Sequence, residues 1–298
     1  MNPSTDLTPK VPRLMSLPQP APAAGDLIDR VAAHLPTTGR LGIAYSGGVD
    51  SATLLAIAHH VLGLDRTLAI MAVSPSLAAR EKAMALDTAT FIGTEVLQIR
   101  TNEQAVAGYR DNDVDRCYFC KNEMFERIDE GVVDKHNLVA VAYGENADDS
   151  RRIDRPGARA ATEHGVLRPL SEAGLTKADV RAVARAFQLP VADKPAAPCL
   201  ASRIPHGQEV TEAKLKQIEA VELTLYELGF SDSRVRHHGD IARIELLIDE
   251  LPRATTPDVA RQIQASASAA GFTYAVVDLR GIQSGAMTLS ILNAKGTL

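Results

Sequence analysis

Ser46-Gly47-Gly48-Val49-Asp50-Ser51 is a turn of small and polar residues between two apolar segments. Residues 41–45 before it (LGIAY) are typical of a short buried strand, and residues 52–58 after it open an apolar helix. A strand–turn–helix connection of this kind directs several backbone N–H groups at one point, near the positive end of the helix dipole. The two glycines let a phosphate approach the main chain, and the two serines add hydroxyl donors. The stretch therefore predicts an anion-binding loop.

This loop differs from a Walker A motif, because it is shorter and no lysine follows its last glycine. An aspartate beside a phosphate site is explained if Mg²⁺ accompanies the nucleotide. In this context the hexapeptide resembles the PP-loop of ATP pyrophosphatases, which split ATP into AMP and pyrophosphate. An ordinary strand–turn–helix corner is the alternative. The residues expected to bind ATP are Ser46, Gly47, Gly48, Asp50 and Ser51.

The composition excludes some classes of protein. The 298-residue chain has a net charge of −5, so it lacks an overall basic field and a nucleic-acid partner is not expected. No apolar run reaches the roughly 18 residues of a membrane span, so no membrane partner is expected either. Six of the 16 prolines fall within residues 1–24, which lack the apolar segment of a signal peptide. We expect a disordered lead over residues 1–25 and a cytoplasmic protein.

Predicted strands and helices alternate after this lead. Strands are expected at 41–45, 67–73, 95–99 and 138–143. Helices are expected at 26–35, 77–92, 121–134 and 176–187, with one more directly after the Ser51 turn. Such alternation predicts an α/β fold, a Rossmann-like parallel sheet with helices on both faces. Ligands of these sheets bind at the carboxyl ends of the strands, where the Ser46 turn would lie.

The pattern changes after residue 211. A helix is expected at 211–228 with Thr211 as its N-cap, then strands at 233–237 and 241–248 joined by a Gly239-Asp240 hairpin. A helix at 256–270 and strands at 273–279 and 286–292 complete the prediction. We therefore expect a PP-loop domain over residues 26–205 and a smaller α+β domain over residues 206–298, which binds substrate and forms oligomer contacts.

The chain has three cysteines, a small and odd number that does not suit a disulfide framework. Cys117 and Cys120 form a CxxC pair between Arg116 and Lys121, and Cys199 lies in a proline-framed loop. Three thiolates can hold an iron–sulfur cluster with one iron left open. A zinc site completed by His206 and a set of inert thiols are the alternatives.

Two further groups of polar residues lie next to predicted strands. Asp148 and Asp149 follow the strand at 138–143 and are candidates to orient Mg²⁺ or substrate, with a solvated capping loop as the alternative. Arg234 and Arg236 share one face of a strand, with Glu245 on the next strand. Paired arginines suit phosphate binding, and a surface salt-bridge ladder is the alternative.

Taken together, these segments resemble the ATP-dependent sulfurtransferases of nickel-pincer nucleotide cofactor biosynthesis, the LarE family. The resemblance runs from about Asp26 to near the end of the chain. Its motifs are residues 45–51 (YSGGVDS), 116–121 (RCYFCK), 144–149 (GENADD), 154–157 (DRPG), 170–177 (LSEAGLTK), 198–205 (PCLASRIP) and 234–245 (RVRHHGDIARIE).

The resemblance implies a reaction. A carboxylate of pyridinium-3,5-biscarboxylic acid mononucleotide attacks the α-phosphorus of ATP, pyrophosphate leaves, and a sulfur nucleophile then displaces AMP to give a thiocarboxylate. In one type of member a single cysteine at the position of Cys199 gives up its own sulfur. In the other type, three cysteines hold a [4Fe-4S] cluster that carries sulfide from a donor. Because Cys117 and Cys120 are also present, this chain resembles the cluster type.

The resemblance also implies site roles. Arg234 and Arg236 match positions that hold the substrate phosphate, and Glu245 matches an acidic site residue. The remaining candidates are Ser202 and Arg203 for substrate binding, and Cys199 and Lys121 for catalysis. Relatives assemble as hexamers, so a homo-oligomer is expected. The alternatives are a PP-loop tRNA thiolase that uses a cluster, and a sacrificial-cysteine enzyme that uses Cys199 alone.

Overall fold

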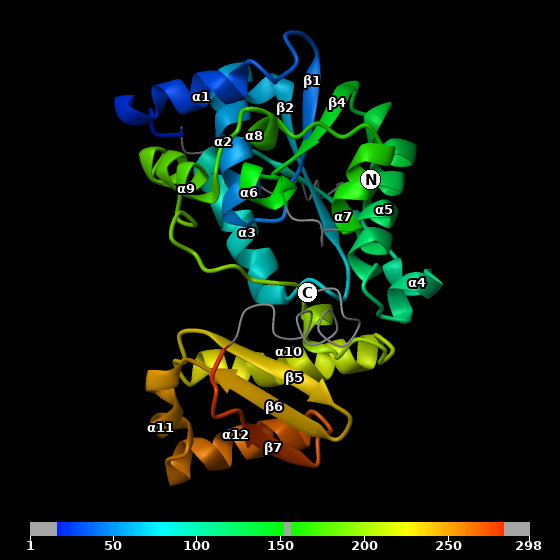
Figure 1. Ribbon diagram of the computed structural model, residues 1–298, viewed down its shortest axis with the longest axis vertical. Helices are drawn as coiled ribbons and strands as arrows, with labels where there is room; N and C mark the ends of the chain where they lie inside the picture. The colour runs from blue at the N-terminus through cyan, green and yellow to red at the C-terminus, as the bar shows by residue number, and fades with distance from the viewer. Residues whose placement is uncertain (1–16, 152–155, 283–298) are drawn as a thin grey trace, which may run out of the picture.

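The computed structural model describes residues 17–151 and 156–282 and contains two β-sheets, one toward each end of the molecule (Figure 1). The first sheet has the order β3-β2-β1-β4, and all its neighbouring strands are parallel. Leu41 of the central strand β1 pairs with Thr67 on one side and with Ala140 on the other. The four strands are β1 (Arg40–Ala44), β2 (Thr67–Val73), β3 (Val96–Arg100) and β4 (Leu138–Tyr143). The predicted α/β fold is therefore confirmed.

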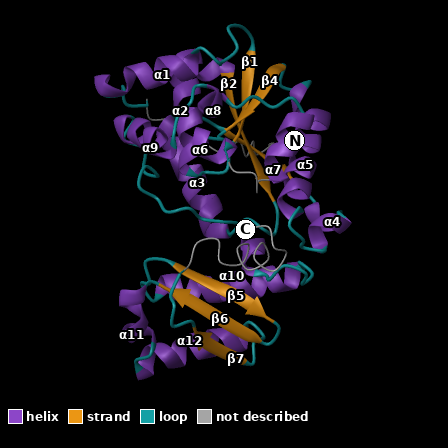
Figure 2. Ribbon diagram, in the orientation of Figure 1, coloured by secondary structure: helices purple, strands orange, loops and turns teal. Residues whose placement is uncertain are grey.

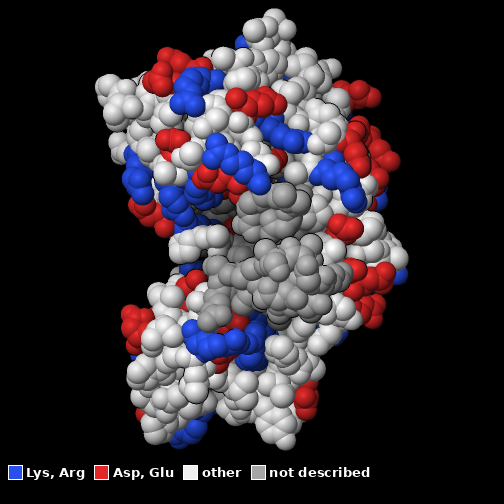
Figure 3. Space-filling model, viewed as in Figure 1, with Lys and Arg blue, Asp and Glu red and all other residues white. Residues whose placement is uncertain are grey.

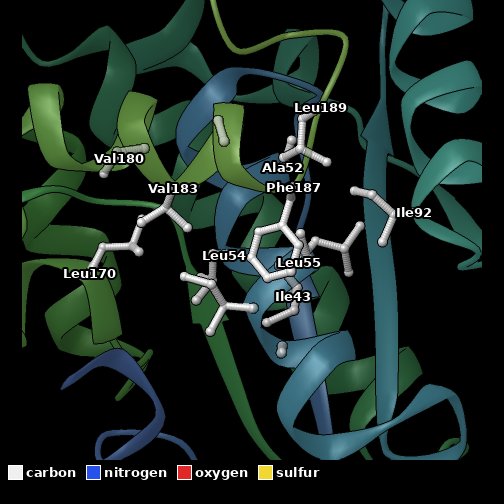
Figure 4. Close-up of a cluster of buried hydrophobic side chains, with 14 of the residues drawn as sticks. Ile43, Ala52, Leu54, Leu55, Ile92, Leu170, Val180, Val183, Phe187 and Leu189 are labelled. Atoms are coloured by element: carbon white, nitrogen blue, oxygen red, sulfur yellow. The ribbon is translucent and has the colours of Figure 1, made fainter. Parts of the chain in front are cut away.

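Helices cover both faces of this sheet (Figure 2). Alternate residues of β1 point to opposite faces, so Ile43 packs in one buried cluster and Ala44 in another. The first cluster joins Ile43 to Leu54, Leu55 and Phe187, which are all fully buried (Figure 4). Its helices are α1 (Gly25–Ala32), α2 (Val49–Leu62), α3 (Ala79–Ile92) and α9 (Lys177–Ala186); the second face carries α5 (Arg116–Ile128) and α7 (Pro156–Glu163). Burial of each such leucine or phenylalanine contributes about 1.5–3 kcal/mol.

Short elements connect these helices and strands. The 3-10 turns are η1 (Pro22–Ala24), η2 (Leu64–Arg66), η3 (Glu103–Ala105), η5 (Leu200–Arg203) and η6 (Ile248–Glu250), and η4 (Asp129–Val133) is a π-helical turn. The short α-helices are α4 (Ala107–Arg110), α6 (Ala147–Ser150), α8 (Pro169–Glu172) and α11 (Leu251–Ala254).

The second sheet is small and mixed. Strands β5 (Ser233–His238) and β6 (Ile241–Leu246) pair antiparallel, and β7 (Tyr274–Val277) pairs parallel with β6. Helices α10 (Glu212–Glu227) and α12 (Pro257–Ala269) pack with these strands. The Thr211 side chain accepts a hydrogen bond from Lys214 N, as an N-cap does. The strand expected at 286–292 lies outside the described residues.

The buried core around the second sheet also includes residues from earlier in the chain. Tyr109, Phe119 and Cys120 pack in it, together with Leu200 and Ile204 of the later segment. Helices α4 and α5 therefore contact the smaller sheet's core through their first turns. The domain boundary near residue 205 stays a prediction, and this core takes residues from both sides of it.

Two local features differ from the expectations. Helix α5 begins at Arg116 rather than at residue 121, so the CxxC pair lies on the helix and not before it. Most of the expected disordered lead lies outside the described residues, but Pro22–Ala24 forms a 3-10 turn, and Ala21 N donates to Ala186 O of α9.

In the part of the chain that the structure describes, no helix is long and apolar enough to cross a membrane.

Candidate active site

The PP-loop connects β1 to α2 at the carboxyl end of the first sheet. Gly47 has φ +74°, and a Cβ on it would lie 2.2 Å from the Cβ of Ala85, so only glycine fits there. The hydroxyl of Ser51 donates to Gly48 O (3.1 Å) and accepts from Ser46 N (3.2 Å). These bonds shape the loop at the N-terminus of a 14-residue helix, where an anion is stabilised.

Asp50 of this loop is held by two partners from distant segments. Its carboxylate forms an ion pair with Lys177 Nζ and accepts a hydrogen bond from Asn146 Nδ2 (3.0 Å). Lys177 is the first residue of α9, and its backbone N donates to Asp148 Oδ2 (2.8 Å). The amide of Asn146 also donates to Asp149 Oδ2 (3.0 Å). The two aspartates of the 144–149 segment are thereby brought beside the PP-loop.

The turn after β4 lies directly against the PP-loop. A Cβ on Gly144 would lie 2.6 Å from Ser51 N, so this close approach requires glycine. The next residue, Glu145, is only 3% exposed and lies 3.6 Å from Arg168 Nε, yet neither carboxylate oxygen accepts a hydrogen bond from a described residue. Such a desolvated carboxylate is costly in a fold and typical of a site that receives a ligand.

Lys121 approaches the same end of the sheet from α5. Its ammonium lies 4.2 Å from the centroid of the Tyr143 ring, the last residue of β4. A Cβ on Gly157 of α7 would lie 2.9 Å from Lys121 Cδ, so the lysine stem passes close to that helix. The predicted catalytic lysine is therefore positioned between α5, α7 and the end of β4.

The three cysteines are free and come from two segments that pack together. Cys117 and Cys120 lie in the first turns of α5, and Cys199 directly precedes η5. Arg116 connects the segments, because its Nη1 donates to Ala201 O (2.9 Å). Burial raises the pKa of the Cys120 thiol well above its ordinary value, and the nearby negative charge of Glu103 raises it further.

A single-ion site is not assembled around these thiols. Among residues 17–151 and 156–282, no three Cys, His, Asp or Glu side chains converge closely enough to hold one metal ion. His206 Nδ1 instead makes a 3.1 Å hydrogen bond with Asn112 O. The structure therefore does not support the zinc alternative in which His206 completes the ligand set.

Three buried arginines lie where η5 meets β5. Arg203 pairs with Glu222 (2.9 Å), and Arg236 pairs with Glu245 (2.9 Å) and donates to Ser202 O (2.8 Å). Arg203 and Arg236 thus each have a carboxylate partner, and Glu245 is shared with Arg243. The Ser202 hydroxyl in turn accepts from Arg203 Nη1 (3.0 Å).

Arg234 differs from these two arginines. It is 6% exposed, and among the described residues its guanidinium has no hydrogen bond or ion pair. Burial lowers its pKa, and the positive charges of Arg203 and Arg236 act in the same direction, against the attraction of Asp232 and Glu245. A buried guanidinium whose donors have no hydrogen-bond partner among the described residues is suited to receive an anion.

The structure therefore forms two groups from the predicted residues. Ser46 to Ser51 meet Asp148 and Asp149 at the first sheet, while Arg203, Arg234, Arg236 and Glu245 gather with Ser202 beside Cys199. The sequence analysis assigned no role to Lys177, Asn146, Glu222 or Asn112, although Asn146 and Lys177 lie within the motifs at 144–149 and 170–177. These residues act through partners far away in the chain, and the Thr176 N-cap next to Lys177 is a local signal.

Surface charge is mixed. On the face shown in Figure 3, acidic and basic side chains of the described residues are interspersed over the larger part of the molecule, and a compact basic group lies on the smaller part. The described part of this face shows no basic field that extends across the molecule.

Comparisons with known proteins identify the family. Residues 24–118 match the family model described as asparagine synthase, which spans β1, the PP-loop and the following strands. The chain is 34% identical over 263 residues to pyridinium-3,5-bisthiocarboxylic acid mononucleotide synthase of Lactiplantibacillus plantarum, covering 86% of this chain and 91% of that protein. It is also 39% identical over 248 residues to an uncharacterized protein of Synechocystis sp., covering 82% and 90% of the two chains. The chain therefore belongs to the LarE family of ATP-dependent PP-loop enzymes.

Proposed function

We propose that this enzyme activates a carboxylate of pyridinium-3,5-biscarboxylic acid mononucleotide with ATP and replaces a carboxylate oxygen by sulfur. The observation that carries the proposal is a preformed PP-loop together with the buried Arg234, whose guanidinium makes no hydrogen bond or ion pair with a described residue. The first supports binding of the ATP phosphates, and the second supports binding of the phosphate of the mononucleotide. The relative from Lactiplantibacillus plantarum is named for a product of this kind.

In the first step, a substrate carboxylate oxygen attacks the α-phosphorus of ATP, and the bond to the β-phosphate bridging oxygen breaks. The leaving pyrophosphate takes the electron pair, and its charge is stabilised by the N–H groups of the PP-loop at the start of α2. Lys177 supplies a cation that the loop itself lacks, because no lysine follows Gly48. Asp50, Asp148 and Asp149 offer carboxylate oxygens of the type that Mg²⁺ prefers.

Mg²⁺ bound by these carboxylates would neutralise charge on the pyrophosphate. Asp50 forms an ion pair with Lys177. Binding of a magnesium nucleotide would draw the Asp50 carboxylate to the metal ion and leave the Lys177 ammonium available to a phosphate oxygen.

In the second step, sulfur attacks the carbonyl carbon of the acyl-adenylate, and AMP leaves with the electron pair of the broken C–O bond. Arg234 and Arg236 would hold the phosphate of the mononucleotide, with Arg203 and Ser202 beside Cys199. This arrangement would place the carboxylates of the substrate near the thiols. Lys121 follows Cys120 in the chain, and its ammonium lies over the Tyr143 ring at the end of β4, where it would add positive charge on the side of the first sheet.

The donor set fits a cluster with three protein ligands. Cys117, Cys120 and Cys199 are all free, they come from adjacent segments, and the buried Arg116 joins those segments. When bound, a [4Fe-4S] cluster would supply an iron without a protein ligand, at which a sulfur atom can reside. The sacrificial use of Cys199 alone remains the second candidate, because Cys199 is exposed and can react directly. Assembly into a hexamer stays a prediction.

Nucleotide product analysis tests the proposal. With the pyridinium dicarboxylate mononucleotide present, we expect ATP to yield AMP and pyrophosphate; without it, we expect neither. Chromatography of the nucleotides and a pyrophosphate assay give the measurement. Formation of ADP would contradict the PP-loop assignment, and equal AMP formation with a tRNA substrate would favour the thiolase alternative.

A further inference from the structure

Asn112 makes an unusual set of contacts in the segment before α5. It is fully buried, with φ 55°, in the left-handed region that asparagine tolerates better than most residues. Its side-chain Nδ2 is within hydrogen-bonding distance of Ile204 O (3.3 Å), Pro205 O (2.8 Å) and Gln208 O (2.9 Å). Its backbone oxygen accepts from Gly207 N (3.1 Å). One residue thus holds most of the turn that follows Cys199 and η5.

The other side-chain atom of Asn112 faces the CxxC helix. Its Oδ1 accepts a 2.6 Å hydrogen bond from Arg116 Nη1, and the same nitrogen donates to Ala201 O (2.9 Å). Arg116 directly precedes Cys117, and Ala201 lies two residues after Cys199. Both Asn112 and Arg116 are buried, so these bonds are shielded from water and resist exchange.

The chemistry of the site requires asparagine. An aspartate would keep the acceptor for Arg116 and tolerate the backbone conformation, but it would bring a carboxylate against three carbonyl oxygens that need a donor. A glycine would keep the backbone conformation and remove the side chain. The two substitutions therefore separate the backbone requirement from the side-chain contacts.

We propose that Asn112 is a positioning residue that fixes the spacing between Cys199 and the Cys117–Cys120 pair. It does so through Arg116 and the turn at 204–208, without touching a reacting atom. The inference deepens the proposed function, because the spacing affects sulfur transfer only if the three cysteines act together. The geometric claim itself can be measured without any sulfur transfer.

The test is chemical cross-linking of the full-length apo protein under reducing, anaerobic conditions. A short bis-maleimide is added, and peptide mass spectrometry measures the fraction of Cys199 linked to Cys117 or Cys120. The variants are Asn112→Asp and Asn112→Gly. Asn137→Asp is the matched control, since Asn137 also has a positive φ (53°) but is exposed and lies away from the cysteines in the chain.

We expect cross-linking in the wild type and in Asn137→Asp. In both Asn112 variants the linked fraction should fall at least about tenfold, because several buried hydrogen bonds are lost at once. ATP–pyrophosphate exchange with the substrate should continue in the Asn112 variants, since adenylation needs no thiol, while thiocarboxylate formation falls. Retained exchange also shows that the variants are folded.

Wild-type cross-linking in Asn112→Gly, with its fold intact, would overturn the proposal. If Asn112→Asp also loses ATP–pyrophosphate exchange, the cross-linked fraction of Asn112→Gly decides the outcome, because that substitution adds no buried charge. If the wild type cross-links and the Asn112 variants do not, but the wild type forms no thiocarboxylate, then the proposed function fails while the positioning role stands.

Discussion

Arg234 offers the sharpest test of the substrate site, because its contribution to binding separates from its contribution to stability. It is buried, and among the described residues its guanidinium has neither a hydrogen bond nor an ion pair. Replacing it by methionine keeps the apolar stem, removes the burial cost of the cation and its repulsion from Arg203 and Arg236, and gives up its attraction to Asp232. We expect Arg234→Met to leave the free energy of unfolding unchanged or to raise it by up to about 1 kcal/mol.

Arg234→Met should weaken substrate binding by more free energy than it adds to stability. A charge-assisted contact to a phosphate is worth about 1.5–3 kcal/mol, so Arg234→Met should weaken substrate binding about 10- to 150-fold. Isothermal titration calorimetry should be run with the mononucleotide and with the nucleoside that lacks the phosphate. The variant should lose affinity for the first and little for the second.

Arg236→Met is the matched comparison. Arg236 pairs with Glu245, which is 2% exposed, and donates to Ser202 O. Its removal should therefore cost about 1.5–3 kcal/mol of stability, although Arg243 still pairs with Glu245 (3.0 Å). Equal destabilisation by both substitutions, or an unchanged dissociation constant in Arg234→Met, would refute this reasoning.

Three further predictions follow from the remaining contacts. Lys177→Met should slow ATP–pyrophosphate exchange about 10- to 100-fold, because the pyrophosphate loses a cation; exchange at the wild-type rate would exclude this role. Cys117→Ala should lose iron after anaerobic reconstitution and stop turning over with added sulfide; full activity, with Cys199 lighter by hydrogen sulfide after one turnover, would establish the sacrificial route. Hydrogen bonds from Arg280 hold the pKa of Asp278 at about 2, so its stabilising contribution should be complete above pH 4 and disappear as pH falls toward 2. Urea unfolding of the wild type and Asp278→Asn across that range should converge at the acid end, and a constant difference would contradict the prediction.

Most of the fold could be predicted from local pattern. The strand at 67–73 has the predicted bounds, and the Thr211 N-cap and the Gly239 turn lie where the sequence indicates, because each rests on short-range preferences. The start of α5 was misplaced. Asp115 at its N-cap is of a residue type that favours a helix start, so the sequence does carry a start signal there, although the Asp115 side chain makes no capping bond.

Fewer of the site's contacts than of the fold's elements could be predicted from the sequence. The loop residues and the strand arginines were found because their spacing carries the information. Lys177 meets Asp50 across 127 positions, and Asn112 meets Pro205 across 93, so no local pattern reveals either pair. Arg234 and Arg236 look equivalent in sequence, and only their contacts show that Arg236 has an ion pair while Arg234 makes none with a described residue.

The shared core beneath the smaller sheet has a mechanical consequence. Tyr109, Phe119 and Cys120 pack with Leu200 and Val235 beneath the smaller sheet. Phe125 and Ile128, further along the same helix α5, pack against the first sheet. One continuous helix therefore enters both cores, and a hinge motion between the two sheets would have to break its packing on one side. The distance from the start of α5, where the CxxC pair lies, to the first sheet is thereby restrained.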